Sequence, residues 1–158
     1  IIMKLSLITK HILRKWQLLP ILYTNLYCNN NTLEHIYPVS YMNHCTHRRD
    51  IHNIFTTSNH INQLRGNYEY NIINNKKDII IIENNIICKK TRSFYPREQD
   101  RGIIARAMLY MRDTYNYTDF GNYTLYNEWN IKYKPTKKEL LHNEFGYIIQ
   151  GNRNKFIV

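Results

Sequence analysis

The sequence predicts an α+β protein, in which strands and helices mix without the regular strand–helix alternation of a parallel sheet. Two observations carry this expectation. Four consecutive isoleucines at 79–82, a polar turn and a second apolar segment at 86–88 indicate a β-hairpin. Apolar residues at helical spacing over 98–115, and again after residue 136, indicate helices in the C-terminal half.

The N-terminal elements are expected to be a helix, a short strand and a two-turn helix. Residues 4–18 carry apolar side chains at helical spacing. Residues 32–37 have the character of a strand that stops at Pro38, because proline donates no hydrogen bond to a strand ladder. Residues 58–65 begin with a serine suited to cap a helix and are followed by Gly66, which suits a helix end.

The later elements follow from the same rules. The isoleucine run at 79–82 is continuous, so we expect this strand to be buried on both faces. Residues 98–115 form an amphipathic helix by spacing, and Thr136 is a suitable cap for a last helix. That last helix carries three apolar residues on one face: Leu141, Phe145 and Ile148.

Length and charge indicate one domain with a polyanionic partner. A chain of 158 residues is the size of one domain, so we expect residues 1–158 to form a single unit. No apolar run is long enough to span a membrane. The formal net charge is +10, and residues 1–33 contain four basic and no acidic residues. Such an excess of positive charge favours nucleic acid or an anionic membrane surface as the binding partner. The alternative is that the charge only keeps the protein in solution.

Cysteine usage and the N-terminal pattern bear on location. Cys28, Cys45 and Cys88 are odd in number and lack CxxC spacing, which argues against a disulfide framework and a cysteine-built zinc site. Lys10 and Arg14 interrupt the apolar stretch that a secretory signal would need. We therefore expect an intracellular protein, or one packaged in a particle, in preference to a secreted one.

Residues 32–68 concentrate the side chains that phosphodiester hydrolysis requires. His35 could accept a proton from water, because an ordinary imidazole titrates near neutral pH. The carboxylate of Glu34 and the amide oxygen of Asn62 are oxygen ligands of the kind that Mg²⁺ prefers, with most of the shell left to water and substrate. Three arginines of the same stretch could hold phosphates: Arg48, Arg49 and Arg65.

Neighbouring residues of a regular strand point to opposite faces of its sheet, so Glu34 and His35 could not share a site in mid-strand. Pro38 follows three residues after His35. We therefore expect His35 to lie at the exit of the strand, where the alternation is lost and both side chains can flank one metal ion.

The sequence around these residues resembles the endonuclease I family of the His-Me finger, or ββα-metal, nuclease class. Four blocks carry the resemblance in order. They are EHIYPVS at 34–40, DIHNI at 50–54 with INQLRGNY at 61–68, a segment with Pro96, Arg101-Gly102, Ala105-Arg106 and Tyr110-Met111, and QGNRNKF at 150–156. In the last block Lys155 stands where the family pattern has proline.

The resemblance implies a His-Me finger core over about residues 32–68. The spacing described above predicts a basic helix at about 4–18 before this core and a helical part at about 98–158 after it. It implies that His35 is the general base and that Glu34 and Asn62 hold one divalent ion, with Mg²⁺ expected and Ca²⁺ or Mn²⁺ as alternatives. Members of the family cut DNA, and often RNA, with little sequence preference and leave 5′-phosphate and 3′-hydroxyl ends.

Other roles stay open at this point. The segment at 40–49 is shorter than the family insertion that supplies a phosphate-binding arginine, so either Arg48 or Arg49 is a candidate. Asp50, His52 and Asn67 are expected to orient loops or neighbouring groups by hydrogen bonds.

Two rival functions remain. One is a nucleic-acid-binding structural protein that keeps the nuclease fold without turnover, and the other is an enzyme that cuts at defined sites. A nuclease inside a cell would also need control, so a protein inhibitor or packaging partner is expected.

Overall fold

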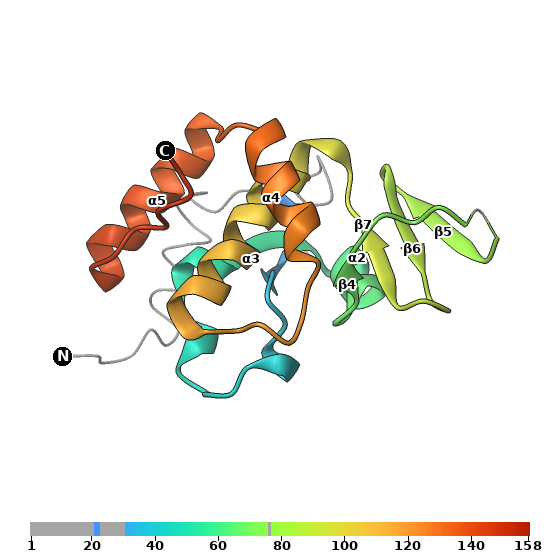
Figure 1. Cartoon of the computed structure of the whole chain (residues 1–158), viewed down its shortest axis with the longest axis horizontal. Helices are drawn as coiled ribbons and strands as arrows, with labels where there is room; N and C mark the ends of the chain where they lie inside the picture. The colour runs from blue at the N-terminus through green and yellow to red at the C-terminus, as the bar shows by residue number, and fades with distance from the viewer. Residues whose placement is uncertain (1–20, 23–30, 76) are drawn as a thin grey trace.

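The computed structural model describes residues 21–22, 31–75 and 77–158, and it confirms the α+β class. In Figure 1 the sheet formed by strands of residues 69–95 lies at one end of the molecule and α5 (Lys137–Gln150) at the other, with α3 (Arg101–Tyr115) and α4 (Tyr123–Lys132) between them. The helix expected at residues 4–18 lies outside the described residues.

A small three-stranded sheet, with strand order β1–β3–β2, is built from the first half of the chain. Its strands are β1 (Ile21–Leu22), β2 (Asn31–His35) and β3 (Ile54–Ser58). Strand β2 pairs antiparallel with β3, so that Glu34 lies opposite Phe55 and His35 opposite Ile54. The strand expected at 32–37 is therefore confirmed, but it ends at His35.

Helix α2 (Asn59–Arg65) follows β3 without a loop. The hydroxyl of Ser58 accepts a hydrogen bond from the N–H of Ile61 and caps the helix, as its sequence predicts. Gly66 ends the helix with a φ of +54°, a conformation that side chains with a Cβ rarely adopt. The direct β3–α2 junction turns the chain back toward β2.

The second sheet has the strand order β4–β7–β6–β5. Its strands are β4 (Glu69–Tyr70), β5 (Ile79–Ile82), β6 (Asn85–Cys88) and β7 (Ser93–Tyr95). The hairpin of β5 and β6 is confirmed. The prediction that this strand is buried on both faces is wrong, because β5 lies at the edge of the sheet and Ile81 is 65% exposed.

Helix α3 (Arg101–Tyr115) is the centre of the main core. It starts after a short 3₁₀ turn, Glu98–Asp100, so the helix expected at 98–115 is confirmed with a different first turn. All residues from Gly102 to Met111 are buried, which is typical of a helix surrounded by other elements. Helix α4 (Tyr123–Lys132) packs beside α3. The sequence did not predict α4.

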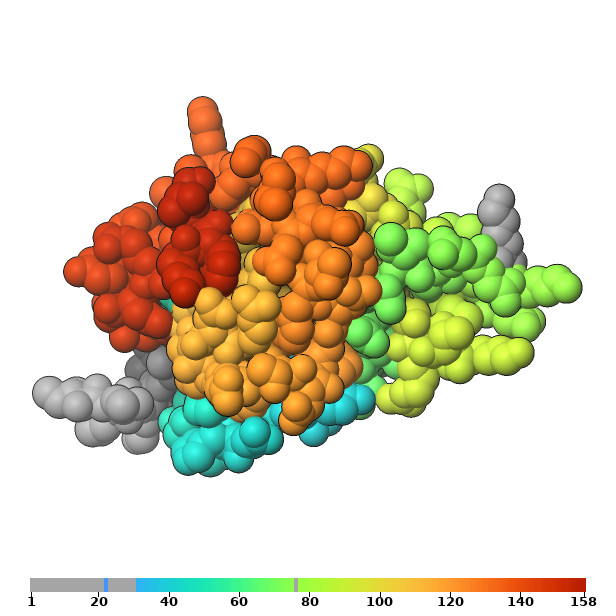
Figure 2. Space-filling view, viewed as in Figure 1, coloured from blue at the N-terminus to red at the C-terminus, as the bar shows by residue number. Residues whose placement is uncertain are grey.

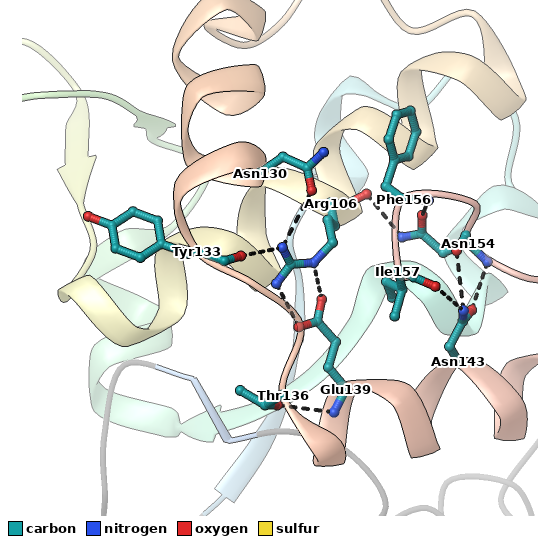
Figure 3. Close-up of polar contacts among 9 residues, drawn as sticks. All are labelled: Arg106, Asn130, Tyr133, Thr136, Glu139, Asn143, Asn154, Phe156 and Ile157. Carbon is teal, nitrogen blue, oxygen red and sulfur yellow. Dashed lines mark hydrogen bonds and ion pairs between the residues drawn. The ribbon is translucent and has the colours of Figure 1, made fainter.

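A buried ion pair connects α5 (Lys137–Gln150) to α3, as Figure 3 shows. The guanidinium of Arg106 donates to both carboxylate oxygens of Glu139, over 2.5 and 2.7 Å. Arg106 also donates to the carbonyl oxygen of Tyr133 and to the side-chain oxygen of Asn130. Because Tyr133 and Asn130 belong to α4 and its end, one side chain joins three helices.

The start of α5 is as expected, because the hydroxyl of Thr136 accepts from the N–H of Glu139. Its apolar residues lie differently. Leu141 is 60% and Ile148 76% exposed, and Phe145 is partly buried. The buried positions are polar or small: Glu139, His142, Asn143 and Gly146. Hydrogen bonds, more than apolar contact, therefore hold this helix in place. None of the helices in the described ranges combines the length and apolar character needed to cross a membrane.

Two buried histidines lie at the inner face of α5, His142 on the helix itself and His52 beneath it. His142 is fully buried, and its Nε2 bonds to the carbonyl oxygen of Ile51. Burial, with a contribution from nearby His52, lowers the pKa of His142 to about 3. Burial also lowers the pKa of His52. A Cβ at position 146 would collide with the His52 ring, so Gly146 is needed for this close approach.

Replacing Glu139 by Gln should lower the free energy of unfolding by about 3 kcal/mol, because the buried Arg106 guanidinium would lose its counter-charge. Urea unfolding followed by circular dichroism would measure the change. The matched control is Glu144→Gln on the same helix, which breaks an exposed ion pair to Arg153. Exposed pairs contribute little, so the control should unfold like the unchanged protein. Equal losses in the two variants would contradict the structural role of the Arg106–Glu139 pair.

Acid should destabilise the protein at a pH where most carboxylates are still ionised. The unfolded chain binds a proton at His142 below about pH 6.5, whereas the folded protein does so only near pH 3. Stability is therefore full above pH 6.5 and falls as the pH falls through this window. His142 alone should remove roughly 2 kcal/mol between pH 7 and pH 5. Urea midpoints at the two pH values test this, and an unchanged midpoint would contradict it. His60→Gln, at an exposed histidine, should keep the pH dependence.

Candidate active site

Glu34, His35 and Asn62 line one open pocket of about 250 Å³, together with Arg65 and Asn67. Strand β2 supplies Glu34 and His35, and α2 supplies Asn62. The close approach of β2 and α2 follows from the direct β3–α2 junction. The structure thus brings together the three residues on which the sequence-based hypothesis depends.

The end of β2 explains how adjacent residues share this pocket. His35 is the last residue of the strand, as expected. Beyond it the carboxamide of Asn53 takes the place of a partner strand. Its Oδ1 accepts from the N–H of Tyr37 over 2.6 Å, and its Nδ2 donates to the Tyr37 carbonyl over 3.0 Å. Pro38, which has no N–H, then turns the chain along the rim of the pocket.

Glu34 is buried, with 3% of its surface exposed. One carboxylate oxygen, Oε1, accepts hydrogen bonds from Arg65 Nη1 over 3.0 Å and from the Tyr70 hydroxyl over 3.4 Å. A buried carboxylate needs such partners, because removal from water is costly. Its position is therefore determined by α2 and β4 together.

Arg65 is also buried, and its guanidinium is bonded within the protein. Besides Glu34, it donates to the carbonyl oxygens of His35 and Ile36, over 3.0 and 2.8 Å. It lies over the ring of Tyr70, with 4.5 Å between the guanidinium carbon and the ring centroid. At 1% exposure, Arg65 is placed to hold the end of β2 against α2, and this burial argues against contact with a substrate phosphate.

The imidazole of His35 is oriented by a backbone carbonyl. Its Nε2 lies 2.8 Å from the carbonyl oxygen of Arg48. A carbonyl can only accept, so Nε2 carries the proton and the lone pair of the neutral ring is on Nδ1. The side chains of Arg48 and Arg49 are exposed in the 3₁₀ turn His47–Arg49.

Asp50 is a hydrogen-bonding centre behind that turn. Its Oδ1 accepts from the N–H of His52 and from Gln150 Nε2, and its Oδ2 accepts from the hydroxyls of Tyr110 and Tyr115. Burial and the Asp50 carboxylate raise the pKa of both tyrosines. The Tyr115 ring stacks on His47 at 3.8 Å between centroids. Asp50 thus supports the turn that orients His35.

The other two expected positions lie in different surroundings. His52 is buried beneath α5, where its Nε2 bonds to the carbonyl oxygen of Asn152. Asn67 lines the pocket, and its Nδ2 donates to the Ser40 hydroxyl over 3.2 Å. Its Oδ1 accepts from Arg92, which brings a cation from the β6–β7 turn to the pocket rim.

Three contributors were missed in the sequence analysis: Asn53, Tyr70 and Arg92. Asn53 belongs to the DIHNI block, and this position in a motif block could have identified it as a residue of the site. Tyr70 and Arg92 reach the site through the second sheet, and no local pattern marks them.

The donor set fits one hard divalent cation. Asn62 Nδ2 donates to the carbonyl oxygen of Leu33 over 3.1 Å, which identifies Oδ1 as the carboxamide atom able to bind a cation. Together with the Glu34 carboxylate this gives two oxygen donors in an open pocket. Within residues 21–22, 31–75 and 77–158, no group of three or more His, Cys, Asp or Glu side chains could hold a metal ion. A cation held by two protein oxygens would leave most of its coordination shell to water and substrate.

A family model and a curated relative show what this chain is similar to. A model of the endonuclease I family matches residues 24–158. A curated relative from Buchnera aphidicola subsp. Acyrthosiphon pisum (strain APS), described as Endonuclease-1, is 30% identical over 109 residues. That alignment covers 68% of this chain and 44% of the relative, so the match spans less than half of the relative's length. Since the family model extends over most of the sequence and includes every pocket residue described above, this chain belongs to the endonuclease I family.

Proposed function

We propose that this protein is a metal-dependent endonuclease that hydrolyses phosphodiester bonds of DNA, and of RNA as a second substrate, with little sequence preference. The observation that carries the proposal is that Glu34, His35 and Asn62 line the same pocket. The endonuclease description of the relative is consistent with this activity.

His35 acts as the general base. The Arg48 carbonyl keeps the proton on Nε2, so Nδ1 accepts the proton of the attacking water. The water oxygen bonds to phosphorus, the bond from phosphorus to O3′ breaks, and O3′ takes up a proton from a second, neighbouring water. The products carry 5′-phosphate and 3′-hydroxyl ends.

Glu34 and Asn62 hold the cation, with Mg²⁺ as the expected ion and Ca²⁺ or Mn²⁺ as alternatives. A cation bound there would neutralise charge on the phosphate and on the leaving oxygen. Arg65 positions the carboxylate of Glu34 and balances its charge inside the protein.

Substrate affinity comes from exposed basic side chains. Arg48 and Arg49 are exposed beside the carbonyl that orients His35, and Arg92 lies at the other rim next to Asn67. Contacts of this kind read the phosphate backbone and no bases, so they give little sequence preference and a steep dependence on salt.

Replacing His35 by Ala should reduce plasmid nicking in Mg²⁺ by about 100-fold to 10,000-fold, the usual contribution of a general base. The control is His60→Ala, which removes an exposed histidine from α2 and should cut like the unchanged protein. Gel analysis of nicked and linear plasmid provides the rates.

Equal nicking by His35→Ala and the unchanged protein would contradict the assignment of the base. Absence of nicking by every variant would favour the structural nucleic-acid-binding alternative. Discrete bands from an unrelated linear DNA, in place of a smear, would favour an enzyme with defined sites.

Replacing Asn62 by Ala should raise the Mg²⁺ concentration needed for half-maximal activity by about tenfold or more, because one of two protein oxygens is lost. Titration calorimetry with Mg²⁺ alone measures the same loss without turnover. Asn59→Ala, at an exposed position of the same helix, is the control. Unchanged Mg²⁺ binding in Asn62→Ala would contradict its role as a ligand.

A further inference from the structure

A second pocket, of about 300 Å³, adjoins the candidate active site. It is formed where the segment after β2 meets the segment after α3, and Figure 2 shows these two segments in contact on one face of the molecule. Ser40 lines both pockets, so the two share a wall. A ligand bound at the active site therefore has the second pocket as its neighbour.

The walls of this second pocket are aromatic. Tyr41 and Phe120 stack with 4.3 Å between ring centroids, and Tyr37 and Tyr117 stack at 4.5 Å. Tyr37 and Tyr117 are buried and form the floor of the pocket, whereas the Tyr41 side chain is 40% exposed. An exposed ring held flat by a partner is a surface on which another planar ring can stack.

The polar groups of the pocket suit a base more than a phosphate. Asn43, Asn116 and Thr118 are neutral donors and acceptors, and Asp119 is acidic. Within the part of the chain that the structure describes, the residues that line this pocket include no arginine or lysine. A phosphate would be repelled by Asp119, whereas a carboxylate and carboxamides hydrogen-bond the amino groups and ring nitrogens of bases.

We propose that this pocket is a subsite for one unpaired nucleobase of the substrate, stacked on Tyr41 and bonded at its edge by Asn43, Asn116 or Asp119. The proposal rests on the function proposed above, because the substrate must be nucleic acid. A base inside a duplex must first be unstacked and unpaired, which is costly. The subsite therefore directs the enzyme toward single-stranded DNA or RNA, or toward unpaired positions in a duplex.

Binding to the full chain carrying His35→Ala tests this without cleavage. The probes are two fluorescent oligonucleotides of equal charge, an octamer of deoxycytidine and an octamer with abasic residues, compared by anisotropy at the same salt concentration. The deoxycytidine octamer should bind about tenfold more tightly, because stacking of one base on an aromatic side chain gives roughly that factor or more.

Adding Tyr41→Ala should remove this difference and leave the affinity for the abasic octamer unchanged. Tyr41→Phe keeps the ring and should keep the difference. Tyr147→Ala is the matched control, since Tyr147 is 44% exposed on α5 away from both pockets. Equal binding of the two octamers, a difference that survives Tyr41→Ala, or binding of neither octamer would overturn the subsite. Base-dependent binding without nicking by the unchanged protein would instead refute the proposed catalytic function and leave the subsite standing.

Discussion

The candidate site depends on one buried cation, the guanidinium of Arg65. It donates to the Glu34 carboxylate and to the two carbonyl oxygens at the end of β2, and it stacks on Tyr70. Without it, the last residues of β2 would present unsatisfied carbonyls and an unbalanced carboxylate to the protein interior. A single side chain from α2 thus determines both the charge and the backbone path of the pocket.

A second network, centred on Asp50, performs the same task for His35. Asp50 joins Tyr110 and Tyr115 of α3 and Gln150 of α5 to the turn that carries the Arg48 carbonyl. The proposed base is therefore oriented through α3 and α5, and the proposed metal-binding carboxylate through α2 and β4. Such support from rigid elements keeps catalytic groups in a fixed geometry.

Sequence rules for caps and turns correctly predicted the elements that depend on a few adjacent residues. The helix that starts after Ser58 and ends at Gly66, the hairpin at β5 and β6, and the cap at Thr136 each depend on a few adjacent residues. The order of the motif blocks allowed the sequence to predict that Glu34, His35 and Asn62 lie together. The sequence could not predict the burial of Arg65, because an arginine at a helix end is usually exposed and no nearby residue indicates which groups accept its hydrogen bonds.

The polar inner face of α5 shows the same limit. An apolar stripe normally identifies the buried side of a helix, but here Glu139, His142 and Asn143 are buried and Leu141 and Ile148 are not. Glu139 is bonded by Arg106 of α3, His142 by the carbonyl of Ile51, and Asn143 by the carbonyls of two C-terminal residues, so no local pattern within α5 indicates these partners. Helix α4, whose buried residues are Leu125, Tyr126 and Trp129, was missed for a related reason, since tyrosine and asparagine weaken its apolar periodicity.

The edge position of β5 has a consequence for the behaviour of the protein at high concentration. Among the described residues no strand pairs with the outer side of β5, and four consecutive isoleucines at such an edge are a template for strand addition by another molecule, the first step of fibril growth. Charges stand at both ends of this strand, Lys77 and Asp78 before it and Glu83 after it. They limit the length of any intermolecular ladder, and the colloidal stability of the protein therefore depends on side chains far from its chemistry.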